Sequence, residues 1–396
     1  MSQYANLWLH RTFLEEVLKK RPDRSKVGYL QNFIWREFFQ WKMFDSRNIL
    51  MERGRGQNQL AGLSSPEGQA LPRPKVSGDT FLSTLMDVKS YALVKPDIVQ
   101  ADLQLGELAV ARATGTSVAR QMESKVTDYI TNEMAENEDV VDNMLEYLAV
   151  GALKNAVTWP PVTNAGAAIT PAPRYWGSEI AGTWNVGLAA ELNQVITSLV
   201  DNAGSAATAD QRKVWSDASA DIIGALDVVD QICRQNHAFT IRGGQIICRS
   251  TLMKHLIKNT AILNLLRGDT HEQPGASGFI TTKQLEDWFA TGLDYKFRFY
   301  DTFWTYEALT KNADYTPSVV YYLNENEIIF IPPQGISGWM GTAPLETEDG
   351  SYNEGGPMPW LYRRPKPPYE REMGVHTVAW PVFADNLMWV RLQVLT

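Results

Sequence analysis

The sequence contains few of the residues that usually carry out catalysis. Its 396 residues include two cysteines, Cys233 and Cys248, and five histidines. Both cysteines lie among apolar residues, where a buried free thiol is the usual state and a disulfide is the alternative. The histidines, at positions 10, 237, 255, 271 and 376, stand singly. No HExxH, CxxC, GxSxG, phosphate-binding loop or calcium-binding loop occurs, so we expect no catalytic residue, no metal and no cofactor.

Long apolar runs are also missing. No segment reaches the roughly 18 uncharged apolar residues that a membrane span needs. The N-terminus has polar and charged residues where a signal peptide needs an apolar region. Hydrophobic residues make up 44% of the chain and 13 residues are Trp, as in folded proteins. We therefore expect a folded, soluble chain that is neither secreted nor bound to a membrane.

The charge is unevenly distributed along the chain. The net charge is −8, yet residues 1–75 hold 13 Lys and Arg against 7 Asp and Glu, a net +6, so the remainder carries −14. Such a basic region on an acidic body suggests a face that meets a polyanion or an acidic neighbour. Scattered surface charge is the alternative, because the basic residues form no continuous block.

The N-terminal region combines a predicted helix with a dense aromatic stretch. Residues 4–20 place Leu7, Leu14 and Leu18 on one stripe, which predicts an amphipathic helix that ends at Arg21-Pro22. Residues 33–44 (FIWREFFQWKMF) then offer six aromatic side chains in twelve residues. Because so short an arm has no core of its own, we expect it to be buried against another lobe or another subunit. A membrane-surface helix is the rival interpretation.

The middle of the chain holds a long excursion and then a long helix. Residues 52–80 are rich in Gly, Pro, Ser and Gln, and residues 81–96 favour strands, which together predict a hairpin or a disordered linker. The apolar spacing from about Ser117 to Lys154 predicts one helix of roughly 55 Å. We expect its acids to form a solvated face, because no His lies near enough in sequence to complete a metal site. They are Glu133, Glu136, Glu138, Asp139, Asp142 and Glu146.

The remainder alternates between short helices and short strands. Helices are expected at 188–204, at 216–235 with Ser219 or Asp217 as the cap, at 251–268 and at 281–289. Strands are expected at 295–309, 375–383 and 386–396, with one hairpin within 239–250 and another that pairs 318–323 with 328–333 across the Asn-Glu-Asn-Glu turn at 324–327. Without a regular βαβ repeat, this pattern predicts an α+β fold.

Four stretches in this order resemble the major capsid proteins of tailed phages, in particular the lambda-type capsid protein E family. They are SYALVKPDIVQADLQ (90–104), NEMAENEDVVDNMLEYLAVGAL (132–153), WSDASADIIGAL (215–226) and LNENEIIFIPPQG (323–335). The first resembles the family's return from its extended loop, the second its spine helix, the third the entry into its second helix and the fourth a strand. The resemblance covers most of residues 45–396, whereas residues 160–212 and the N-terminal arm are longer than in the family.

The resemblance implies a tailed-phage/herpesvirus-type major capsid fold with five parts. Residues 1–65 would be an N-terminal arm and 66–103 an extended loop. Residues 104–237 would form a peripheral domain with the spine helix at 117–154 and an insertion near 160–212. Residues 238–345 would form an axial domain, and 346–396 a return loop with C-terminal strands.

The resemblance further implies a structural protein that assembles through pentamers and hexamers into an icosahedral shell around double-stranded DNA. Its partners would be copies of itself, decoration, scaffold and portal proteins, and weakly contacted DNA, in a virion assembled in the host cytoplasm. An encapsulin-like nanocompartment and a soluble enzyme with a triad formed in space are the alternatives. The residues expected at subunit interfaces are Phe33, Trp35, Phe38, Phe39, Trp41, Phe44, Phe81, Lys89, Tyr91, Lys95, Glu325 and Glu327.

Overall fold

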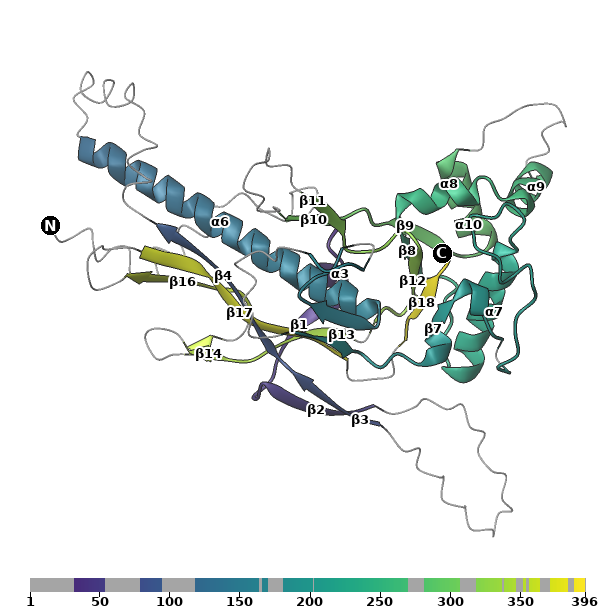
Figure 1. The fold of residues 1–396 in the computed structure, drawn as a ribbon, viewed down its shortest axis with the longest axis horizontal. Coiled ribbons are helices and arrows are strands. Elements are labelled where there is room, and N and C mark those ends of the chain that lie inside the picture. The colour runs from purple at the N-terminus through teal and green to yellow at the C-terminus, as the bar shows by residue number, and fades with distance from the viewer. Residues whose placement is uncertain are drawn as a thin grey trace, which may run out of the picture.

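The computed structural model shows a long helix lying on one sheet and, beside it, a lobe of helices around a second sheet (Figure 1). This mixture of helix and sheet confirms the α+β prediction. The expected helix at 4–20 lies outside the described residues. The residues that the structure describes are 32–53, 79–94, 118–163, 166–169, 181–201, 203–269, 281–306, 318–336, 338–346, 352–353, 356–363, 371–383 and 388–395.

The first sheet is organised around one long strand near the C-terminus. The 13-residue β17 (Arg371–Phe383) pairs with β16 (Met358–Arg363) on one side, up to His376, and with β4 (Met86–Val94) on the other, up to Ala379. Its second half pairs with β13 (Gly338–Thr342), which in turn pairs in parallel with β1 (Phe39–Met43). The described strands of this sheet thus come from the two ends of the chain.

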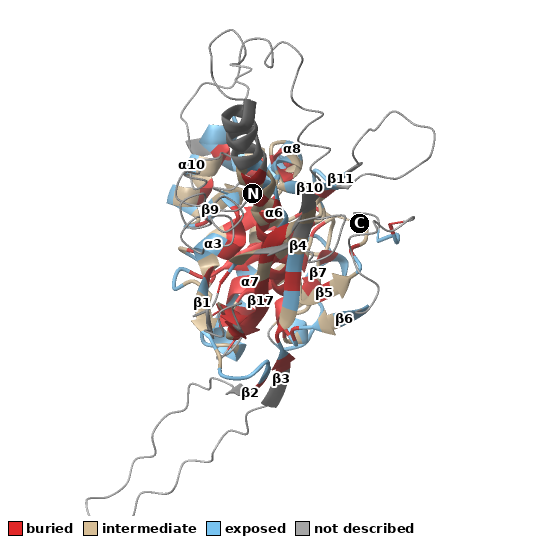
Figure 2. Ribbon diagram, turned by 90° about the vertical axis from the view of Figure 1, so that its left-hand side faces the viewer, coloured by how far each residue is buried: buried red, intermediate tan, exposed pale blue. Residues whose placement is uncertain are grey.

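The helix α6 (Val118–Leu153) covers one face of this sheet, which confirms the predicted spine. Its 36 residues span about 54 Å at about 1.5 Å per residue. Ile130, Met134, Val141 and Leu145 are fully buried, as expected for a helix whose apolar stripe faces a sheet. Figure 2 shows buried residues where α6 meets β17.

A two-stranded ribbon leads away from this sheet. The strand β2 (Asn48–Arg53) pairs antiparallel with β3 (Asp79–Thr84), and residues 54–78 between them lie outside the described residues. The pairing agrees with the hairpin that the sequence suggested. It also places residues 48–53, which were expected in the N-terminal arm, in the ribbon.

The second sheet lies in the helical lobe. Its strand order is β7-β18-β12-β8-β9, with β12 central and every residue of β12 buried. Short helices surround this sheet in Figure 1. The elements are β7 (Asn193–Val195), α7 (Ile222–Asn236), β8 (Gln245–Cys248), α8 (Met253–Leu256), α9 (Thr260–Asp269), α10 (Thr282–Gly292), β9 (Lys296–Phe299), β12 (Glu327–Ile331) and β18 (Val390–Gln393).

Smaller strand pairs complete the described chain. A ribbon formed by β10 (Phe303–Tyr306) and β11 (Ser318–Tyr321) stands between α6 and the helical lobe in Figure 1. The other two pairs join β5 (Ala156–Trp159) to β6 (Gly182–Asn185) and β14 (Leu345–Glu346) to β15 (Tyr352–Asn353).

Two of the expected helices differ from the prediction: one is absent and the other has a different N-terminal cap. The helix expected at 188–204 is wrong, because Asn193–Val195 pair in parallel with β18 and only short 3₁₀ turns flank them. The helix α7 exists, but Asp221 is its cap and accepts a hydrogen bond from the Gly224 N–H at 2.9 Å. The candidate cap Asp217 instead accepts from the Ser219 N–H at 2.8 Å, in the turn before the helix.

The helix expected at 251–268 is divided. Asn259 interrupts it, because its side chain donates to the Ala220 carbonyl at 2.8 Å and accepts from the Ile262 N–H at 3.1 Å. The second of these contacts satisfies a free N–H group at the start of α9.

Both expected hairpins of this lobe are wrong in their pairing. Residues 239–250 contain one strand, β8, which pairs with β12 and β9. The strand β11 pairs with β10, whereas β12 lies between β18 and β8. The strands were therefore located from their apolar residues, but their partners are distant in sequence.

Gly244, immediately before β8, is required because the chain there lies very close to β12. A Cβ at this position would lie 2.1 Å from the Ile331 carbonyl oxygen. We expect Gly244→Ala to lower the free energy of unfolding by about 2–3 kcal/mol, since overpacking forces the backbone to shift. Urea unfolding of the unassembled protein measures this. Gly292→Ala is the control, because its Cβ would meet only ordinary contacts at 3.6 Å or more; equal midpoints for the two variants would contradict the prediction.

Candidate functional site

A buried carboxylate on the spine helix joins three parts of the chain. Glu146 is fully buried and accepts hydrogen bonds from the backbone N–H groups of Ile34 at 2.8 Å and Trp35 at 2.9 Å. It also accepts from the Tyr300 hydroxyl, which follows β9 of the helical lobe. Ile34 and Trp35 begin α3 (Ile34–Phe38), so Glu146 holds the arm, the spine and the lobe together. We call Glu146 and these three donors the arm joint.

The arm joint has the geometry that an ionised carboxylate needs, since all three partners donate. Burial nevertheless raises the pKa of Glu146 to about 7, because desolvation disfavours the charge. The Tyr300 hydroxyl, the two backbone donors and the charge of Arg298 act in the opposite direction. Glu146 is thus a buried group that changes charge near neutral pH.

Further polar contacts surround the arm joint. Arg36 pairs with Asp142 at 2.6 Å, and the Tyr322 hydroxyl donates to the Asn143 carbonyl at 3.2 Å. Arg298 of β9 pairs with Glu37 of α3. The expectation of a solvated acidic face is therefore wrong for Asp142 and Glu146, which are buried. It holds for Glu136, which is exposed.

A second buried carboxylate lies where the spine helix ends. Glu327 forms ion pairs with Lys154, at 3.4 Å, and with Arg391 of β18. Although burial acts to raise the pKa of Glu327, the charges of Lys154 and Arg391 hold it below its usual range. Nearby, the Trp389 indole N–H donates to the Leu153 carbonyl at 2.9 Å, so the last turn of α6 is tied to the second sheet at two points. We call Glu327, Lys154 and Arg391 the spine-end cluster.

The two acids of the Asn-Glu-Asn-Glu turn thus behave differently. Glu327 is the buried first residue of β12, so its assignment to a solvated turn and to a subunit interface is wrong. Glu325 is exposed over 63% of its side chain and lies 3.9 Å from Arg249, and it agrees with the predicted turn.

The aromatic arm is mostly buried within its own chain. Phe33, Trp35 and Phe39 are buried in the core, where Phe39 meets Phe383 edge to face at 5.7 Å between ring centroids. Their assignment to subunit interfaces is therefore corrected, because the lobes of the same chain already cover them. The half-buried residues at 38, 41 and 44 pack against the same core. This part of the chain is a short helix followed by a strand. The alternative interpretation, in which it forms a helix on a membrane surface, is therefore wrong.

The other expected interface residues lie around β3 and β4. Lys89 is exposed on β4, and its backbone position lies opposite His376 in the register with β17. Phe81 and Tyr91 lie on β3 and β4, but their side chains are outside the described part of the structure. Lys95 also lies outside the described residues.

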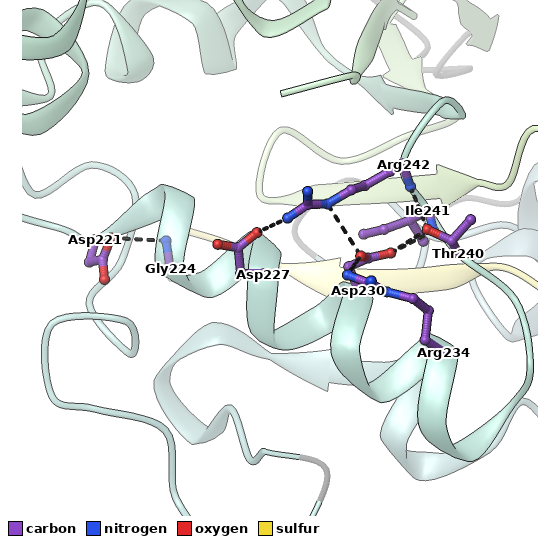
Figure 3. Close-up of polar contacts among 8 residues, drawn as sticks. All are labelled: Asp221, Gly224, Asp227, Asp230, Arg234, Thr240, Ile241 and Arg242. Atoms are coloured by element: carbon purple, nitrogen blue, oxygen red, sulfur yellow. Dashed lines mark hydrogen bonds and ion pairs between the residues drawn. The ribbon is translucent and has the colours of Figure 1, made fainter. Parts of the chain in front are cut away.

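A third buried acid, which the sequence did not reveal, fixes α7 to the loop before β8. Asp230 is fully buried and accepts from the Thr240 hydroxyl at 2.7 Å and the Ile241 N–H at 3.0 Å (Figure 3). It also pairs with Arg234 and Arg242. The available signal was its place next to Val229 on the apolar side of a predicted helix, where a carboxylate must be paired. Because its oxygens are held by hydrogen bonds and ion pairs within the lobe, its role is structural.

The described residues contain no candidate metal site. No group of three or more His, Cys, Asp or Glu side chains there could hold a metal ion. Cys233 and Cys248 are buried free thiols, as expected, and burial raises the pKa of each. Among the described helices, none is long and apolar enough to cross a membrane.

Comparison with known proteins places this fold. Residues 16–166, which include the arm joint's α3 and Glu146, match the family model described as phage major capsid protein E. This stretch is similar to the phage major capsid protein E family. The match over these residues supports a shell-forming role in a phage capsid, in which many subunits assemble together. A search of curated proteins finds no match.

Several solved structures are similar to this chain. A prophage protein from E.coli CFT073, described as a capsid protein, is 12% identical with a TM-score of 0.50, and the match covers 93% of this chain and 97% of that one. The mature capsid of bacteriophage PhiM1 is 9% identical with a TM-score of 0.43, over 91% of this chain and 86% of that one. A phage-related protein of Bordetella bronchiseptica RB50 is 8% identical with a TM-score of 0.41, over 97% and 96%. The first of these supports the tailed-phage major capsid fold predicted from the sequence.

Proposed function

We propose that this capsid protein assembles through pentamers and hexamers into the icosahedral head shell that encloses the double-stranded DNA of a tailed phage. The observation that supports this most is the fixation of the spine helix to both lobes, at the arm joint and at the spine-end cluster. A shell subunit must connect the contacts that it makes on its opposite sides into one rigid body. A helix of about 54 Å that is attached near one end to a second lobe can provide this rigid connection. The protein thus serves assembly and catalyses no reaction.

The two lobes are assigned proposed positions in the capsomer. The sheet of β17 with α6 is the peripheral lobe, and the second sheet with its helices is the axial lobe, which approaches the symmetry axis. The expected boundaries need adjustment, because β7, α7 and β18 belong to the same lobe as β12, whereas β13 belongs to the sheet of β17. The axial lobe therefore draws on the described residues within 186–300, 322–336 and 388–395.

Subunit contacts are assigned to the exposed residues that the fold leaves outside its cores. They include Lys89 on β4, Glu325 in the turn before β12, and the half-buried sides of Phe38, Trp41 and Phe44. Interfaces of this permanent class bury about 2,000–5,000 Å². Scaffold, decoration and portal proteins are further partners, and assembly occurs in the host cytoplasm before DNA enters.

The basic N-terminal region is proposed to meet acidic neighbours, whereas the acidic body contacts the packaged DNA only weakly. DNA is held chiefly by Lys and Arg contacts to its phosphates, and residues 76–396 carry a net charge of −14.

Electron microscopy of negatively stained particles tests the proposal. We expect the native protein to form closed shells that contain DNA. Shells filled with protein and free of DNA would indicate a nanocompartment instead. A homogeneous small oligomer that forms no shell under any assembly condition would contradict a capsid role.

A further inference from the structure

The ribbon of β10 and β11 presents an apolar face to solvent. In its antiparallel register Phe303 lies opposite Tyr321, and Thr305 opposite Val319, so these four side chains share one face. Phe303 is 48% exposed and Val319 is 47% exposed. On the opposite face Trp304 packs against the core and Val320 is buried. We call the four side chains of the exposed side the outer ribbon face.

This face is unusual among the described residues. Among all described residues, five large apolar side chains are exposed. Two of these five, Phe303 and Val319, lie on this one small face. A two-stranded ribbon is marginally stable in water without a covering layer, so an exposed apolar face on it calls for an occupant.

The rim of the outer ribbon face is acidic. Asp301 and Glu325 flank it, with 43% and 63% of their side chains exposed. The cation between them, Arg249, is largely covered, because its guanidinium carbon lies 3.6 Å from the centroid of the Tyr321 ring. An occupant with an apolar stripe and an adjoining positive charge would therefore match both the face and its rim.

The chain itself supplies such a segment, next to where its described part begins. The first described residue is Asn32, and the ring of Phe33 lies 6.4 Å from that of Tyr322, which directly follows β11. Residues 1–31 hold six basic and three acidic residues. The predicted stripe of Leu7, Leu14 and Leu18 is followed at once by the basic run at 19–21.

We propose that residues 4–20 cover the outer ribbon face of the same chain, with Leu14 and Leu18 against Phe303 and Val319 and with Lys19 and Lys20 beside Asp301 and Glu325. The eleven residues between this segment and Asn32 reach at most about 40 Å, which is sufficient for a return to the adjoining ribbon. The tether also gives the segment a high effective concentration at the face, whereas another molecule must supply it from solution.

Alkylation of a cysteine at Thr305 in the full-length chain tests the covering. Thr305 is exposed in the described part of the structure, and the native Cys233 and Cys248 are buried, so the added thiol is the one that reacts quickly. We expect Thr305→Cys to react about 10-fold faster when Leu14→Ser and Leu18→Ser remove the apolar stripe, which corresponds to about 1.4 kcal/mol of covering. Thr12→Ser and Glu16→Ser on the opposite side of the predicted helix are the control and should leave the rate unchanged. Equal rates in all three chains would overturn the proposal.

Zero-length coupling of amines to carboxylates identifies the contact and its origin. We expect cross-links from Lys19 or Lys20 to Asp301 or Glu325 in unassembled protein. In a mixture of isotopically light and heavy chains, each cross-link should join peptides of the same label. Mixed-label cross-links would place the segment on a second copy and overturn the assignment to the same chain. Glu325→Lys together with Asp301→Lys should abolish the cross-links and raise the alkylation rate at Thr305→Cys, and the added substitutions Lys19→Glu and Lys20→Glu should restore the slow rate.

Discussion

Replacing Glu146 by glutamine is expected to flatten the dependence of stability on pH between about 4.5 and 7. Burial raises the pKa of this carboxyl from its usual 4.5 to about 7, so in this window the native state holds a proton that the unfolded state has released. Stability therefore falls as pH rises through the window, by about 3 kcal/mol for a shift of this size. Below 4.5 the group is protonated in both states, and its favourable contribution relative to high pH is complete.

The physical cause is the cost of ionising a carboxyl that water cannot reach. Above neutral pH the charge is compensated by the Tyr300 hydroxyl and two backbone N–H groups, and more distantly by Arg298. Asp142 is a neighbouring acid on the same helix, but Arg36 pairs with it. Glutamine cannot ionise, so the variant lacks this contribution to the slope.

Urea unfolding of unassembled protein at a series of pH values measures the effect. Other groups also titrate, so the informative quantity is the difference in slope between the wild-type protein and Glu146→Gln. Glu136→Gln is the control, because Glu136 lies on the same helix and is exposed. Parallel curves for the wild-type protein and Glu146→Gln would show that Glu146 keeps an ordinary pKa despite its burial.

The spine helix was predictable because its signal is local. Apolar residues at helical spacing over 36 residues leave no competing period, and the expected and observed ends agree within one residue. The burial of Glu146 was not predictable from the same segment. An acid among acids on a helix is ordinarily solvated, and the partners that bury this one lie 112, 111 and 154 residues away.

The strands show the same division between local and distant information. The apolar run at 328–331 predicted β12 correctly, but the hairpin with 318–323 was chosen because the two segments are adjacent. The observed neighbours of β12 are β8 and β18, which are more than 50 residues away on either side. They pair with both of its edges, and every residue of β12 is buried. Long-range pairing of this kind leaves no mark on a single sequence beyond continuous hydrophobicity.

The aromatic arm was misassigned for a related reason. A segment with six aromatic residues in twelve must be covered, and the sequence offered two covers, another lobe or another subunit. Phe33 and Trp35 are covered by the chain's own lobes because Glu146 binds the first N–H groups of α3 and fixes this segment between them. The contact that places the arm against its own chain is thus made by Glu146, the buried acid that could not be predicted from the sequence pattern.

Glu327→Gln is expected to destabilise the protein by about 3–5 kcal/mol, whereas Glu325→Gln should change the free energy of unfolding by less than about 0.5 kcal/mol. The two residues are two positions apart in one turn, yet Glu327 is buried between Lys154 and Arg391 and Glu325 is exposed. Glutamine keeps the shape of the side chain but leaves both cations of the spine-end cluster without a counter-charge. The loss of stability comes from leaving two partly buried cations unpaired. It is smaller than for fully buried charges, because the side chains of Lys154 and Arg391 are partly exposed to water.

The pH dependence separates this effect from that of Glu146. The pKa of Glu327 is lowered, so its stabilising contribution is present above the usual value of 4.5 and is lost as pH falls through the lowered pKa. The wild-type protein should therefore lose more stability than Glu327→Gln on acidification below 4.5, where the pH dependence of Glu146 has ended. Chemical unfolding at pH 7 and at pH 3 measures both terms, with Glu325→Gln as the matched control. Equal midpoints for the two glutamine variants at pH 7 would mean that the spine helix is not held to the second sheet by this cluster.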